Sequence, residues 1–312
     1  MSKTILLYDG DYLRYSIGFA SECFAVMYGD SEVFKSGSML ECKSYCESVG
    51  LESDHVDIRK VASPVAHCLA SVRRAIESAV SKTGADEVII FLSGSKNFRT
   101  SIARMKEYKG NRKEFVKPLL YNDITEYLKK RYNAVLTNGI EADDALSIKA
   151  LELQSAGYTA IIATADKDLM QVPTKIYNVQ THAITDVLSA PFGELTLKMQ
   201  GSGAVLKGYG MKFFYAQMLT GDTVDNIPGV PRLGANKAFS LLSECETEQD
   251  CQLAVEEAYK NAYGEDVKVR VSWDGLEWSG NYKDIMLENG KLLWMLREKP
   301  NSSGTHIWKH WW

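Results

Sequence analysis

Carboxylates are concentrated in four separated stretches of this sequence. Two of the stretches follow apolar runs of strand length, and the other two read Ile-Glu-Ala-Asp-Asp-Ala-Leu-Ser and Thr-Gly-Asp-Thr-Val-Asp-Asn. If the stretches meet in the folded chain, they form a strongly acidic site. The carboxylates concerned are Asp9, Glu141, Asp143, Asp144, Asp166, Asp168, Asp222 and Asp225.

Such a site needs cations. Two carboxylates ~4 Å apart repel by roughly 4 kcal/mol at an effective dielectric near 20. Magnesium and manganese bind carboxylate and phosphate oxygens at the same time. Two such ions can hold a phosphodiester, lower the pKa of the attacking water and stabilise the leaving oxygen. The cluster therefore predicts two-metal phosphodiester hydrolysis, although each carboxylate alone also fits a helix cap or a solvated turn.

Local spacing supports the gathering of these side chains. If Glu141 begins a helix, it and Asp144 lie three residues apart on one helical face, and Asp222 and Asp225 have the same spacing. Each pair can then direct two carboxylates toward one point.

Basic residues are concentrated in a different segment, 99–131. It holds ten lysines and arginines against four acidic residues, in a chain whose formal net charge is -4. An acidic chain with one basic segment can bind a polyanion through that segment.

The elements that must position these groups are alternating strands and helices. This alternation predicts an α/β domain with a central, mostly parallel sheet flanked by helices on both faces. We expect strands at 5–8, 87–92, 160–164 and 175–179, and helices at stretches such as 65–80 and 119–131.

Sites in α/β folds form at the carboxyl ends of the strands. Asp9 follows the first expected strand, and Asp166 and Asp168 follow the third. The second strand ends in Ser93 instead of a carboxylate. The strand-end positions therefore agree with the acidic site in two of the three cases.

The pattern of alternating strands and helices ends near residue 195. A glycine-bearing stretch follows, then helices expected around 213–219 and 237–242, with a glycine-rich turn between them. All six tryptophans lie from Trp273 onward, as in a tail that packs on its own domain or docks on a partner. We expect an α/β core at 1–195, including the basic segment, and a helical subdomain with a tryptophan-rich tail at 196–312.

Composition indicates an ordinary globular protein. The 312 residues are 45% hydrophobic, no apolar run reaches membrane-spanning length, and the start lacks the apolar stretch of a signal peptide. Six cysteines form no CxxC pair, which favours free thiols in a reducing compartment. We therefore expect a soluble, cytoplasmic protein without membrane contact.

The motifs and their order resemble the 5′ nuclease (flap endonuclease) superfamily, most closely its phage-type 5′-to-3′ exonucleases. The resemblance covers residues 5–242. Its elements are Leu-Leu-Tyr-Asp9-Gly-Asp, Asn-Phe-Arg99, Tyr108-Lys109-Gly110-Asn111-Arg112, Glu141-Ala-Asp143-Asp144, Thr-Ala-Asp166-Lys-Asp168, Gly221-Asp222-Thr-Val-Asp225-Asn226-Ile227-Pro228-Gly229-Val230 and Gly234-Ala-Asn-Lys237-Ala.

For the acidic site, the resemblance implies two magnesium ions, for which manganese substitutes. One ion is expected on Glu141, Asp143 and Asp166. The other is expected on Asp168, Asp222 and Asp225. Asp9 and Asp144 are expected to support the site through water or hydrogen bonds.

For the basic segment, the resemblance implies a helical arch or clamp that passes a 5′ single strand. Tyr108 is expected to stack on a base, while Lys109 and Arg112 neutralise the phosphate. The residues expected to act in catalysis are Lys109, Arg112 and Asp9, and Arg99 and Arg104 are expected to bind DNA beside Tyr108.

The glycine-rich turn resembles the family's helix-hairpin-helix-like element, which holds duplex DNA through backbone amides. Its expected DNA contacts are Gly229, Val230, Gly234 and Lys237, and the family suggests potassium at this turn. Ser93 stands where many relatives have an aspartate, so we expect altered metal affinity and retained activity.

The implied substrate is duplex DNA with a 5′ end or a 5′ flap, extending to RNA–DNA hybrids in primer removal. A monomer is expected, with a replication-protein partner at the C-terminal tail.

Three alternative functions remain: a haloacid-dehalogenase phosphatase with Asp9 as nucleophile and Asp11 as acid, a PIN-type RNase, and a DNA-binding module that does not cleave.

Overall fold

A six-stranded sheet forms the centre of the protein. The computed structural model describes residues 2–112, 116–201 and 203–299. The strand order is β6-β5-β1-β7-β8-β9, and every neighbouring pair is parallel except β8 and β9. The α/β prediction is confirmed. The strands are β1 (Thr4–Asp9), β5 (Glu87–Leu92), β6 (Val135–Leu136), β7 (Thr159–Thr164), β8 (Lys175–Asn178) and β9 (Ile184–Asp186).

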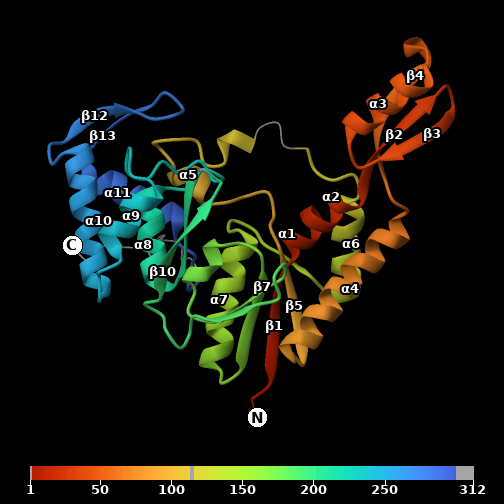
Figure 1. Ribbon diagram of the computed structural model, residues 1–312. Helices are drawn as coiled ribbons and strands as arrows, with labels where there is room; N and C mark the ends of the chain where they lie inside the picture. The colour runs from red at the N-terminus through yellow and green to blue at the C-terminus, as the bar shows by residue number, and fades with distance from the viewer. Residues whose placement is uncertain (1, 113–115, 202, 300–312) are drawn as a thin grey trace.

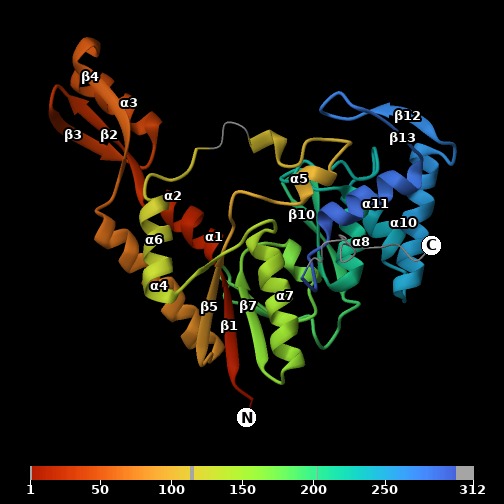
Figure 2. The same ribbon diagram turned by 180° about the vertical axis from the view of Figure 1, so that it is seen from behind.

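Alternate residues of β1 face opposite layers of the protein. Leu7 packs with α7 (Ala142–Ser155), whereas Leu6 packs with α4 (Val65–Thr83) and α6 (Tyr121–Tyr132) on the other face. Figures 1 and 2 show these helices on the two sides of the sheet. The two expected helices are confirmed, and both end beyond their predicted limits.

A small antiparallel unit was not predicted. It comprises β2 (Glu22–Tyr28), β3 (Ser31–Ser36), α3 (Met39–Val49) and β4 (Val56–Ala62), with strand order β3-β2-β4. The unit stands away from the sheet in both views (Figures 1 and 2). Its interior is small, built around Val26, Cys42 and the stacked rings of Phe34 and Tyr45. Many of its other residues are charged and exposed, so its apolar pattern was weak in the sequence.

Helices packed around one core make up most of the second half. Phe214 and Met218 of α8 meet Val255 and Tyr259 of α10 and Ile285 of α11. The expected helices at 213–219 and 237–242 lie within α8 and α9, but the glycine-bearing stretch is a hairpin, β10–β11. The elements are β10 (Glu194–Gln200), β11 (Gly203–Tyr209), α8 (Gly210–Thr220), α9 (Ala235–Leu242), α10 (Glu248–Tyr263), β12 (Lys268–Val271), β13 (Glu277–Gly280) and α11 (Tyr282–Leu293).

The end of the second half returns to the central sheet. Met295, just after α11, packs with α7. No helix in the described ranges is long and apolar enough to cross a membrane. Short helical turns complete the chain: α1 (Gly10–Tyr12), η1 (Leu13–Ile17), α2 (Gly18–Ala20), η2 (Ser53–His55), α5 (Arg99–Ile102), η3 (Gly110–Arg112) and η4 (Asp168–Gln171).

Candidate active site

A hollow of about 700 Å³ lies at the carboxyl ends of the parallel strands. Asp9 is the last residue of β1, and Asp166 follows β7. Asp168 begins η4 just after Asp166, and the start of α7 and the turn after α8 supply the other carboxylates. The expected carboxylates that line the hollow are Asp9, Glu141, Asp143, Asp166, Asp168, Asp222 and Asp225. The structure therefore brings together all four stretches.

Asp9 is held rigidly at the end of β1. Its Oδ1 accepts hydrogen bonds from the backbone N–H of Asp11 (3.0 Å) and of Tyr12 (3.2 Å), and Oδ2 accepts one from Thr164 Oγ1 (3.0 Å). Both oxygens are thus engaged, which disfavours the alternative in which Asp9 is a nucleophile. Burial raises the pKa of Asp9 to about 7, and the negative charge of Asp11 adds to the effect.

The pKa values of other carboxylates in the hollow are also raised. Burial raises the pKa of Asp168 to about 8, with the charge of Asp166 as the next cause. Burial likewise raises the pKa of Asp143, with a further contribution from Asp9. A divalent cation would favour the ionised forms, because metal ligation competes with protons.

Basic side chains pair with the carboxylates on one side of the hollow. The Lys109 ammonium contacts the Glu141 carboxylate and lies 3.7 Å from that of Asp225. Arg112 donates to Asp225 at 2.7 Å, and Lys167 lies 2.6 Å from Asp222. Burial acts to raise the pKa of Glu141, but Lys109 and Arg99 outweigh it and lower that pKa.

The donor set fits a hard divalent cation, since it consists of carboxylates without cysteine or histidine. Within the described ranges, however, no three such groups are close enough to enclose an ion in this arrangement. The ion pairs of Lys109, Arg112 and Lys167 give a physical reason, because they already use oxygens of Glu141, Asp225 and Asp222. Binding two ions thus requires side chains to exchange partners.

Arg99 and Asp144 do not belong to this surface. Arg99 is fully buried and makes two bonds to Asp144, of 2.6 and 2.8 Å. It also donates to the carbonyls of Leu292 and Trp294. The prediction that Arg99 binds DNA is therefore wrong, while the oxygens of Asp144 are occupied by hydrogen bonds within the protein. Asp144 instead accepts the backbone N–H of Glu141 (3.2 Å), which orients that residue.

Tyr108 is also turned inward. It is 8% exposed, and its hydroxyl lies 3.0 Å from Glu141 Oε2 and 2.8 Å from Asp225 Oδ2. A ring in this position cannot stack on a base, so that prediction is wrong. Tyr108 instead connects two carboxylates of the hollow.

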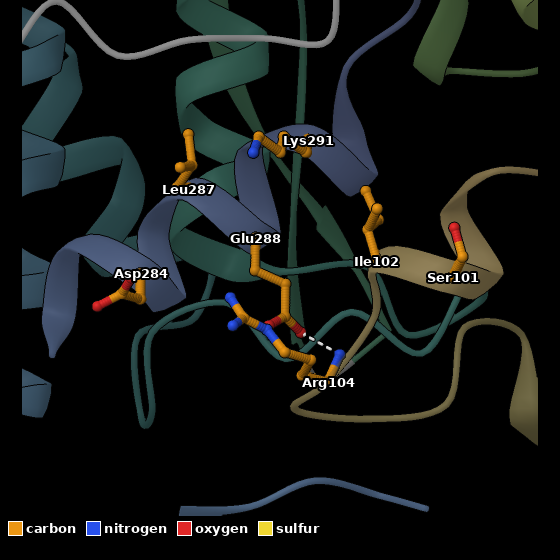
Figure 3. Close-up of a pocket in the computed structure, with 7 residues that line it drawn as sticks. All are labelled: Ser101, Ile102, Arg104, Asp284, Leu287, Glu288 and Lys291. Atoms are coloured by element: carbon orange, nitrogen blue, oxygen red, sulfur yellow. Dashed lines mark hydrogen bonds and ion pairs between the residues drawn. The ribbon is translucent and has the colours of Figure 1, made fainter. Parts of the chain in front are cut away.

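Arg104 lies outside the hollow, at a second depression of about 300 Å³ (Figure 3). Glu288 of α11 accepts the backbone N–H groups of Arg104 (2.8 Å) and Met105 (2.7 Å) and pairs with the Arg104 guanidinium (3.2 Å). The Arg104 side chain remains 42% exposed. Glu288 thus anchors the beginning of the segment that leads to Lys109.

The glycine-rich turn after α8 is closely packed. Gly221 and Gly229 both have positive φ, and a Cβ on Gly229 would lie 2.3 Å from the nitrogen of Gly221. Gly229 and Val230 are buried, and the Val230 N–H donates to Leu219 O. The structure does not support DNA contacts by these two residues. Gly234 and Lys237, at the start of α9, are exposed.

Two charged residues of the hollow were not predicted as part of the acidic metal site. Asp11, two residues after Asp9, and Lys167, between Asp166 and Asp168, both line it. Their positions next to assigned carboxylates were the available signal. Ser93 also lines it, and its Oγ accepts the N–H of Ala142 (2.8 Å) at the start of α7.

Part of the core is similar to known proteins. Residues 58–194 match the family model of the 5'-3' exonuclease, N-terminal resolvase-like domain. Over this domain, the chain is similar to the 5′-3′ exonuclease family. The 5′-3′ exonuclease of Buchnera aphidicola subsp. Schizaphis graminum is 34% identical over 164 residues, which are 50% of this chain and 52% of that protein. The DNA polymerase I of Geobacillus stearothermophilus is 26% identical over 221 residues, covering 68% of this chain and 22% of the polymerase.

The chain thus spans about half the length of the curated exonucleases that it matches. Among solved structures, bacteriophage T5 flap endonuclease in a complex with DNA and metal ions has a TM-score of 0.49 and 17% identity, covering 83% of this chain and 88% of that one. T5 5′-exonuclease with bound zinc has a TM-score of 0.47 at the same identity, with the same coverage. The similarity of residues 58–194 to the exonuclease domain disfavours the PIN-type RNase and phosphatase alternatives.

Proposed function

We propose that this protein is a divalent-metal-dependent 5′-to-3′ exonuclease that hydrolyses phosphodiester bonds in DNA. The observation that carries the proposal is the meeting of the four acidic stretches with Lys109 and Arg112 in one hollow at the strand ends. A phosphodiester is anionic, so an acidic hollow needs cations to admit it. The match of residues 58–194 to the 5'-3' exonuclease domain model supports this reaction.

Magnesium is the cation that the donor set suits, with manganese as a substitute. Glu141, Asp143 and Asp166 would hold one ion, and Asp168, Asp222 and Asp225 the other. Bound there, two ions supply an activated water and charge stabilisation for the leaving oxygen. Potassium at the turn after α8 stays a prediction.

Lys109 and Arg112 have a double role in this proposal. They pair with Glu141 and Asp225 in the structure, and both line the hollow. When a phosphate enters, the same ammonium and guanidinium groups can turn to it and neutralise its developing charge. The exchange would leave Glu141 and Asp225 free to bind cations.

The backbone keeps these basic groups at the hollow. Lys109 donates its N–H to Asp225 O at 3.0 Å, and Asn226 Nδ2 donates to Glu107 O at 2.9 Å. Asn111 Nδ2 donates to Thr223 O at 2.7 Å. The basic segment and the turn after α8 are therefore tied together, so Lys109 can change partners without leaving the site.

For the substrate, we favour duplex DNA with a 5′ end or a 5′ flap, with removal of RNA from hybrids as an extension. Residues 1–195 would carry the chemistry together with Asp222 and Asp225 from the turn after α8, and 99–131 would form the clamp. Residues 196–312 would hold the duplex, with Gly234 and Lys237 exposed for contacts that do not read sequence. We expect a cytoplasmic monomer, in the host cell if the protein is phage-encoded. The tail expected to contact a replication protein includes 300–312, which lie outside the described residues.

The test uses DNA duplexes labelled at the 5′ or the 3′ end, blunt or flapped, with magnesium or chelator. Short products released from 5′ ends only with magnesium, and lost in Asp166→Ala, would support the proposal. The matched control is Asp54→Ala, an exposed aspartate of the β2–β4 unit, which should cleave normally. If the wild type binds these DNAs but leaves them intact in magnesium and in manganese, the non-cleaving binding module replaces the exonuclease.

A further inference from the structure

We infer that Asp11 is a further carboxylate of the metal site and supplies, at the end of β5, the negative charge that Ser93 does not provide. The inference rests on the proposed function and extends it to a residue that belongs to none of the four assigned groups. Its basis is the position of Asp11, its hydrogen bonds and its neighbours in the hollow.

The first observation is where the backbone places Asp11. The preceding residue, Gly10, fits tightly against the end of β5, since a Cβ on it would lie 2.5 Å from the carbonyl oxygen of Phe91. Directly after it, Asp11 Oδ1 accepts the N–H of Ser93 at 3.1 Å. Asp11 thus occupies the carboxyl end of β5, although it is encoded after β1.

The second observation is how the side chain is fixed. Arg14, which is 3% exposed, contacts Asp11 Oδ1 and also donates to Ser93 O at 3.0 Å. Two donors therefore hold Oδ1, while no residue in the described ranges donates a hydrogen bond to Oδ2. A carboxylate whose first oxygen is held by hydrogen bonds and whose second oxygen accepts none can bind a cation through the second oxygen.

The third observation is which groups share the hollow with Asp11. Asp9 and Asp143 line the same hollow as Asp11. Among the described residues, neither Asp9 nor Asp143 forms an ion pair with a basic side chain, in contrast to Asp222 and Asp225. Asp11 therefore shares the hollow with two carboxylates whose oxygens no lysine or arginine of the described residues holds.

A purely structural role for Asp11, neutralising buried Arg14, must be separated from metal binding. The experiment measures Mn²⁺ binding to the full chain by calorimetry, without DNA. Asp11→Asn is compared with the double variant Asp11→Asn/Arg14→Gln, which removes the ion pair as a unit. The control is Asp54→Asn, and thermal unfolding without metal is recorded for every protein.

We expect Asp11→Asn and the double variant to bind Mn²⁺ about tenfold more weakly or worse, as for other groups that support metal ligands. The double variant should recover part of the thermal stability that Asp11→Asn loses. Adding Ser93→Asp to Asp11→Asn should restore Mn²⁺ affinity, because it returns a carboxylate to the end of β5.

Two results would overturn the inference: wild-type Mn²⁺ affinity in Asp11→Asn, or recovery of that affinity in the double variant. Either result would leave Asp11 as a structural partner of Arg14 and the exonuclease proposal intact. If the wild type itself binds neither Mn²⁺ nor Mg²⁺, the proposed function fails together with the inference.

Discussion

Lys109 contacts Asp225 through both its backbone and its side chain. Its N–H donates to the Asp225 carbonyl at 3.0 Å, and its ammonium lies 3.7 Å from the Asp225 carboxylate. Lys109 has a φ of +57°, an unusual conformation for a residue with a side chain. The surrounding bonds must therefore hold it, and such strain is common where a side chain is aimed at a functional site.

Replacing Lys109 by alanine should separate metal binding from catalysis. We expect kcat/KM on 5′-labelled duplex DNA to fall roughly 10²-fold or more, since a preorganised positive group is lost. Mn²⁺ affinity should rise, because the ammonium no longer competes for Glu141 and Asp225. Lys82→Ala, an exposed lysine at the end of α4, should change neither. Weaker Mn²⁺ binding in Lys109→Ala would contradict the competition.

The Arg99–Asp144 pair should contribute to stability rather than to DNA binding. Asp144→Ala leaves a buried guanidinium without its main partner, so we expect the free energy of unfolding to fall by about 3–5 kcal/mol. Urea denaturation checks this value. Replacing both residues with apolar ones should cost less than the sum of the single changes. Additive losses would show that the two side chains act independently.

Stability without metal should fall as pH rises. The pKa of Asp9 is raised to about 7 and that of Asp168 to about 8 in the folded protein, above the unfolded values near 4. The folded state therefore binds more protons than the unfolded state across this interval, and stability is lost as pH rises from about 4 to about 8. Unfolding in chelator at pH 5, 7 and 9 measures the slope.

One substitution and one added ion should each reduce the pH dependence of stability. Asp168→Asn removes one of the titrating groups, and saturating Mn²⁺ stabilises the ionised carboxylates of the folded state. Stability in chelator that rises between pH 5 and pH 8 would contradict the assignment of raised pKa values to this hollow.

Glu288 should position the basic segment without touching the metal. Glu288→Ala removes the acceptor for the backbone N–H groups of Arg104 and Met105. We expect KM for DNA to rise and Mn²⁺ affinity to stay at the wild-type value. Glu288→Gln keeps a neutral acceptor and should give a smaller change. Equal effects of the two variants would mean that the charge, and not the hydrogen bonds, positions the segment.

The sequence by itself determined the α/β fold and the gathering of the acidic stretches. Both follow from local rules: apolar runs of strand length alternate with helical periodicity, and a carboxylate after a parallel strand lies at the sheet's carboxyl edge. Asp9 and Asp166 obey the second rule, so their meeting needed no knowledge of distant packing. The order of the motifs was sufficient to indicate the resemblance to 5′ nucleases, and residues 58–194 match the 5'-3' exonuclease domain model.

Only the tertiary structure decided which charges face the hollow and which are buried in pairs. Arg99 resembled a DNA contact, but it lies beneath α11 and pairs with Asp144, while Asp11 reaches the end of β5 although it follows β1. The two residues of each contact are between 45 and 193 positions apart in the sequence. Their formation depends on how whole elements pack, and periodicity within a short window carries no information about that packing.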